Sequence, residues 1–151
     1  MHQRRKAREV TLQVLYALDV QEMGPQEAMN LFWANFDAPA EARKFSSFLI
    51  EGTWENRAQI DELISGNSEN WTIARMSRVD KSILRMAVYE LLYCQDIPPK
   101  VTLNEAIDLG KVFGSENSGA FINGILDALY GKLRSKDEDQ AIDGHAGHVE
   151  P

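Results

Sequence analysis

The residues with the clearest chemical capability lie within the first nine positions of the chain. Arg4, Arg5, Lys6 and Arg8 place four cations within five residues, opposed only by Glu9. Cations at this density bind phosphate oxygens, and because the whole chain has a net charge of −7, the basic cluster is a local feature. The segment predicts a small nucleic-acid contact. A solvated, frayed helix end is the alternative interpretation of the same charges.

Other residue types that often perform chemistry lack supporting neighbours. Cys94 lies in an apolar run with no histidine close in sequence, which is typical of a small core residue in a reducing cytoplasm. Glu90 lies in the same run, where a buried carboxylate is more often bonded to a helix N-terminus or an arginine than used as a general base. His145 and His148 have the spacing of a metal pair but lie in an acidic tail without periodicity. These patterns predict no catalytic residue, no metal site and no cofactor.

A helix from Ser77 to Cys94 is the element around which the other segments are expected to pack. Plotted at about 100° per residue, its apolar side chains cover nearly the whole circumference of the second half. A helix that is apolar on most sides is surrounded by other elements. Ser77 and Asp80 have the spacing of an N-terminal cap, and the pair Pro98 and Pro99 ends the helix. The pattern predicts the central helix of an all-α domain.

Helical periodicity also covers most of the chain on either side. Helices are predicted over residues 3–22, 25–35, 40–64, 71–76 and 102–113, and from the loop at 115–118 to residue 134. Gly52 interrupts one of them in mid-helix, which indicates a close crossing with another helix. Residues 1–134 are therefore expected to form one helical domain with a basic N-terminal segment, and residues 135–151 a disordered acidic tail.

Two aromatic positions have alternative interpretations. Phe121 lies about 100° from the buried stripe of the last helix, beside Asn117, so its ring either covers that loop or presents a surface for binding. Leu12 and Tyr16 continue the outer side of the first helix beyond the basic cluster. They either pack under a neighbouring helix or form a surface for a partner.

Several separated segments, in order along the chain, resemble the NusB family of transcription antitermination factors. The resemblance covers residues 4 to about 134 and rests on VDKSILRMAVYELL at 79–92, IPPKVTLNEAIDLGKVFG at 97–114 and FINGILDAL at 121–129. In addition, RRKAREVTLQVLYALD at 4–19 and IEGTWENRAQIDELI at 50–64 resemble the first and third helices of the family. The resemblance implies an all-α fold of about seven helices in two packed helical bundles.

The same resemblance implies a cytoplasmic binding protein, not an enzyme. Members of the family bind boxA RNA of ribosomal RNA transcripts together with a small ribosomal-subunit protein, NusE. They do so within an antitermination complex with RNA polymerase, with no cofactor and no membrane. By position, Asp80 matches the acidic residue that helps to receive the protein partner. The residues that match the RNA-binding positions of the family are Arg4, Arg5, Lys6, Arg8, Asn117, Ser118 and Phe121.

Two positions depart from the family pattern. Ala120 stands where many members have a lysine, and the change removes one phosphate contact. Asn117 stands where the family often has an acidic residue, and the neutral side chain removes a repulsion from phosphate. We expect the two changes to offset each other in part.

Two other functions fit parts of the sequence. A similar helical module precedes the catalytic domain of some ribosomal-RNA cytosine methyltransferases, but this chain has no room for a methyl-donor domain and no glycine-rich strand-to-helix turn. A protein-interaction or dimerisation module would use Leu12 and Tyr16. Charge reversal within residues 4–8 separates this alternative from the RNA-binding hypothesis, because it would abolish RNA binding alone.

Overall fold

The computed structural model describes residues 2–35, 37–67 and 73–147, with side chains described as far as residue 133. These residues form seven α-helices and one short 3₁₀ helix, without a strand among them, so the predicted all-α fold is confirmed. The elements are α1 (His2–Val20), α2 (Pro25–Asn35), α3 (Ala40–Glu55), α4 (Arg57–Ser65), η1 (Ile73–Arg75), α5 (Arg78–Tyr93), α6 (Pro99–Phe113) and α7 (Ser118–Gly147).

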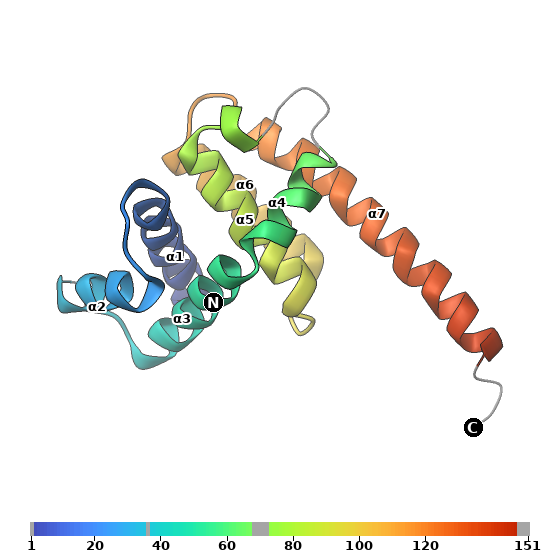
Figure 1. Cartoon of the computed structure of the whole chain (residues 1–151), viewed down its shortest axis with the longest axis horizontal. Coiled ribbons are helices and arrows are strands. Elements are labelled where there is room, and N and C mark those ends of the chain that lie inside the picture. Colours follow the sequence, from blue (N-terminus) through green and yellow to red (C-terminus); the bar gives the residue numbers. More distant parts are fainter. Residues whose placement is uncertain (1, 36, 68–72, 148–151) are drawn as a thin grey trace.

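Helix α5 is the centre of the molecule, as its composition predicts. It contacts α1, α3, α4, α6 and α7, and every residue from Ser82 to Glu90 is buried (Figure 1). Ser77 caps its start, because the Ser77 hydroxyl oxygen accepts a hydrogen bond of 3.1 Å from the Asp80 backbone N–H. Cys94 follows its last turn and is buried, which confirms that it is a core residue.

The helices form two groups that share α5. Helices α1, α2 and α3 pack on one another, while α4, α6 and α7 pack around α5 on its other side (Figure 1). The crossing of α3 with α5 is close at Gly52, where an added Cβ would overlap the Tyr89 ring, so the predicted close approach is confirmed. A second close crossing joins α6 to α7 at Gly110, where an added Cβ would lie 2.7 Å from Ile122.

Three predicted helix boundaries are wrong. The helix expected over 40–64 is divided at Asn56, whose side-chain amide donates 2.8 Å to the Gly52 carbonyl and so competes with the backbone for that acceptor. Helix α6 begins at Pro99 and not at Thr102, because proline fits the first helical position and the Thr102 side chain is turned inward.

The last boundary is that of α7, which continues to Gly147 although its end was expected near Arg134. Residues 135–143 contain neither glycine nor proline, so no backbone signal stops the helix before Gly144. The C-terminal part of α7 extends past the other helices (Figure 1). The side chain of His145 and all of His148 lie outside the described residues. Within the described part of the chain, no helix is long and apolar enough to cross a membrane.

Candidate nucleic-acid interface

The basic segment forms the first turns of α1, and its cations divide between two sides of the helix. Arg4 and Arg5 face α6 and the loop before it, where each has a carboxylate partner, whereas Arg8 pairs with Glu90 of α5 and with Glu105 of α6. Arg4 makes the loosest pair, with 3.5 Å between its Nη2 and Oδ2 of exposed Asp96. Lys6 is exposed and has no ion pair with a described side chain. The segment is therefore a folded helix end and not a frayed one.

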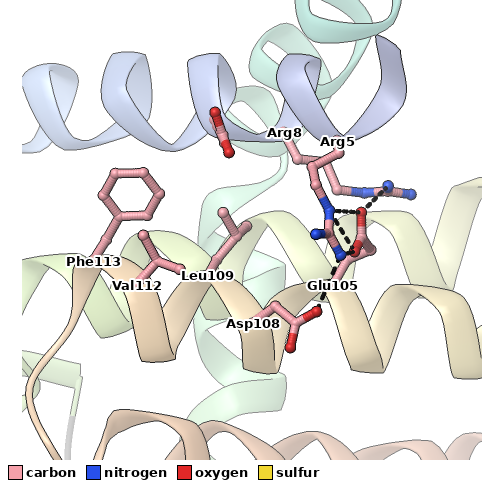
Figure 2. A pocket seen from close by; sticks show the side chains of 8 residues that line it. Arg5, Arg8, Glu105, Asp108, Leu109, Val112 and Phe113 are labelled. Carbon is pink, nitrogen blue, oxygen red and sulfur yellow. Dashed lines mark hydrogen bonds and ion pairs between the residues drawn. The ribbon is translucent and has the colours of Figure 1, made fainter. Parts of the chain in front are cut away.

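Arg5 is held by two carboxylates of α6. Its Nε donates to both oxygens of Glu105 at 3.2 and 3.3 Å, its Nη2 contacts the same carboxylate, and Nη2 lies 3.1 Å from Oδ2 of Asp108 (Figure 2). The hydrogen bonds from Arg5 lower the pKa of Glu105 and in turn raise the pKa of Arg5. The carboxylates of α6 thus neutralise the positive charge of Arg5, which the sequence analysis predicts to bind RNA.

Arg8 is an interior residue, with only 4% of its side chain exposed. Its Nε and Nη2 donate to the two oxygens of Glu90 at 2.9 and 2.8 Å, and Thr102 donates its hydroxyl to the same carboxylate at 3.2 Å. Burial lowers the pKa of Arg8, but the bonds and charge of Glu90 outweigh burial and raise it. The prediction that Glu90 is a structural carboxylate bonded to an arginine is confirmed. The direct RNA contact expected of Arg8 does not fit this burial, because its donors are used inside the protein.

A groove lies between the start of α1 and α6. Its volume is about 640 Å³, and Ile97, Pro98 and Val101 are the apolar residues that line it. The charged residues that line it are Arg4, Arg5, Arg8, Asp96, Glu105 and Asp108. A narrower part continues between the two helices from Arg5 to Phe113, at the end of α6 (Figure 2).

The second predicted cluster lies where α6 turns into α7. Asn117 is exposed, as an RNA contact requires. Ser118 is 1% exposed, and its hydroxyl oxygen accepts a 2.9 Å bond from the Ser115 backbone N–H, so it shapes the loop instead of facing solvent. Phe121 is partly buried and packs against the hydrophobic core. The structure shows that Phe121 is neither a fully buried core residue nor a fully exposed one, and its contact with RNA stays a prediction.

Helix α6 joins the two clusters. Glu105, the partner of Arg5, precedes Phe113 by eight residues, or about 12 Å along the helix. Asp80 is not part of this surface, because it lies in the first turn of α5, whose last turn precedes Asp96. Asp80 is 8% exposed, and its Oδ1 has no hydrogen-bond partner among the described residues.

The residues that sequence reasoning missed are the carboxylates that face the arginines. Glu105 and Asp108 share one side of α6, and the spacing of three residues was visible in the sequence. Nothing in that spacing says which helix they face, because their partners lie about a hundred positions away in the chain.

Comparisons with known proteins agree with this arrangement. The model of the NusB family matches residues 5–131. The transcription antitermination protein NusB of Syntrophus aciditrophicus is 68% identical over 142 residues, which cover 94% of this chain and 88% of that protein. Its counterpart from Desulfatibacillum aliphaticivorans is 48% identical over 130 residues, covering 86% and 91%.

Solved structures of NusB proteins are also similar to this chain. The structure of T. maritima NusB is 37% identical with a TM-score of 0.77, covering 85% of this chain and 90% of that one. A crystal structure of the antitermination factors NusB and NusE in complex with dsRNA contains a chain that is 27% identical, with a TM-score of 0.79 and coverage of 87% and 98%.

Proposed function

Because this chain belongs to the NusB family, we propose that it is a transcription antitermination factor that binds boxA RNA of ribosomal RNA transcripts. It does so together with the small ribosomal-subunit protein that acts as NusE, in an antitermination complex with RNA polymerase in the cytoplasm. It works by binding and not by catalysis. The observation that carries the proposal is the arrangement along α6, which connects the basic end of α1 to the exposed Asn117 loop.

The residues divide into contacts and supports. Arg4, Arg5 and Lys6 are exposed and reach phosphate oxygens, while Asn117 and the accessible part of Phe121 meet unpaired bases. Two further residues position these contacts from inside the protein: Arg8 fixes α1 against α5, and Ser118 fixes the loop.

The carboxylates of α6 compete with RNA phosphates for Arg5. A phosphate that binds Arg5 must displace Glu105 and Asp108, so part of the gain in ion pairing is lost. The acidic chain therefore binds RNA weakly alone. A basic partner that docks near the start of α5 extends the positive surface, and the negative charge of the largely buried Asp80 attracts it there.

The deciding experiment is a titration of labelled boxA RNA with the protein, alone and with its ribosomal partner, at several salt concentrations. Lys6→Ala is the first variant, because Lys6 has no ion pair whose loss would confuse the result. We expect weaker binding and a flatter salt dependence, by up to about 0.7 in the slope of log K against log salt. Lys132→Ala, an exposed lysine of α7, is the matched control. Equal binding of boxA and scrambled RNA, or no binding even with the partner, would refute the proposal.

The alternative interaction surface on α1 receives less support. Leu12 is 3% exposed and packs in the core, whereas Tyr16 is 41% exposed. The two side chains therefore do not form one continuous outer surface. Tyr16 alone presents too little apolar area to define a dimer interface.

A further inference from the structure

Three aromatic rings of α3 and α5 lie next to one another in a row. Phe48 of α3 lies 5.5 Å from the central ring, that of Tyr89, and Tyr93 lies 4.8 Å from it on α5. Tyr89 is 6% exposed and fills the space left by Gly52, so it belongs to the core. Phe48 and Tyr93 are each 45% exposed. Isolated exposed rings are ordinary, but two that flank a fixed third ring form an aromatic surface.

This surface continues from the proposed RNA interface through Arg4. A second groove, of about 330 Å³, runs between α1 and α3 and is lined by Gln3, Arg4, Glu41, Lys44, Phe45 and Phe48. Arg4 also lines the groove between α1 and α6, so the two grooves meet at its side chain. Its guanidinium lies over the Phe45 ring at 4.8 Å, which holds it between them.

The charges around the rings favour one orientation of a bound strand. Arg4 of α1 and exposed Lys44 of α3 both line the second groove, and Glu41 is the acidic group that lines it as well. Exposed Glu51 and Glu55 lie further along α3 and would repel phosphates there. A strand therefore places its phosphates beside Arg4 and Lys44 and turns its bases toward the rings.

We propose that Phe48 and Tyr93 form a base-stacking subsite for single-stranded RNA that continues past the basic segment, across the start of α1, with Arg4 and Lys44 holding its phosphates. The inference rests on the proposed function and adds a binding site to it. Stacking on aromatic rings accepts any base, so the subsite adds affinity for flanking RNA without adding sequence preference.

The test compares a short boxA RNA with the same RNA lengthened by about six uridines at either end. Phe48→Leu and Tyr93→Leu keep the apolar bulk and remove the aromatic face. Leu31→Ala, which truncates a 53% exposed side chain of α2, is the matched control, and Tyr93→Phe keeps the ring. Urea unfolding of each variant shows whether the fold is retained.

We expect one of the lengthened RNAs to bind the unmodified protein more tightly than the short RNA. Phe48→Leu and Tyr93→Leu should reduce that gain about 5-fold to 100-fold and leave the short RNA unaffected, while Leu31→Ala and Tyr93→Phe keep it. Two results overturn the inference: equal binding of short and lengthened RNAs, or leucine variants that lose the ribosomal partner and keep the RNA. Failure of the short RNA itself to bind would refute the proposed function instead.

Discussion

Replacing Arg8 should lower the stability of the fold and leave the RNA affinity of the folded protein unchanged. In Arg8→Met, the Glu90 carboxylate would stay buried with only the Thr102 hydroxyl as its partner. Breaking a buried ion pair in this way costs about 3 to 5 kcal/mol, a large part of the roughly 5 to 15 kcal/mol by which domains of this kind are stable. With an m value of about 2 kcal/mol/M, the urea midpoint should fall by about 1.5 to 2.5 M.

A double variant distinguishes the cost of losing the ion pair from the cost of leaving one charge buried and unpaired. Removing both partners in Arg8→Met with Glu90→Leu leaves no unpaired charge, so it should be less destabilised than either single variant. Urea unfolding at pH 7 measures stability, and RNA titration measures the affinity of the folded fraction, which should be unchanged. If Arg8→Met keeps its stability but binds RNA with a flatter salt dependence, Arg8 is an RNA contact and its interior role is wrong.

Three further substitutions test other parts of the surface. Hydrogen bonding to Arg5 lowers the pKa of Glu105 in the folded protein. The stability that ionised Glu105 contributes is therefore present above its unfolded pKa near 4.3 and is lost as the pH falls through its folded pKa. Glu105→Gln should reduce this loss of stability in acid, which unfolding experiments between about pH 3 and 6 measure. Asp80→Asn should lower the free energy of unfolding by no more than about 1 kcal/mol and weaken binding of the ribosomal partner, and the reverse pattern would make it a purely structural residue. Phe121→Ala should reduce both RNA affinity, about 5-fold to 100-fold, and stability, because part of its ring packs against the core; a change in stability alone would remove Phe121 from the interface.

The sequence predicts where the helices lie better than it predicts which residues pack against one another. The central position of α5 follows from composition, because a helix that is apolar on most sides has to be surrounded. The close crossing at Gly52 follows from the conformational cost of glycine in a helix. The division at Asn56 was missed because a side-chain amide that competes for a backbone carbonyl leaves the apolar periodicity unchanged.

The candidate site shows the same limit more sharply. Four cations within five residues look alike in the sequence, yet Arg8 is buried while Lys6 is exposed. The two residues differ in burial because they lie at different positions around α1 relative to α5 and α6. Helical periodicity predicts on which side of α1 a residue lies, but not which helix packs against that side. The residue types predicted a phosphate-binding surface, but tertiary packing determines which guanidinium groups can reach a ligand.

That packing also changes what the carboxylates of α6 do for RNA. Glu105 and Asp108 hold Arg5 at the groove through several hydrogen bonds, so less side-chain freedom is lost when a phosphate arrives. The same carboxylates must be displaced or left close to that phosphate, which lowers affinity. Because the two effects oppose each other, we expect a pre-positioned arginine to give weak binding that a partner's positive charge strengthens. We therefore expect an acidic chain with a basic helix end to need its partner in order to bind RNA tightly.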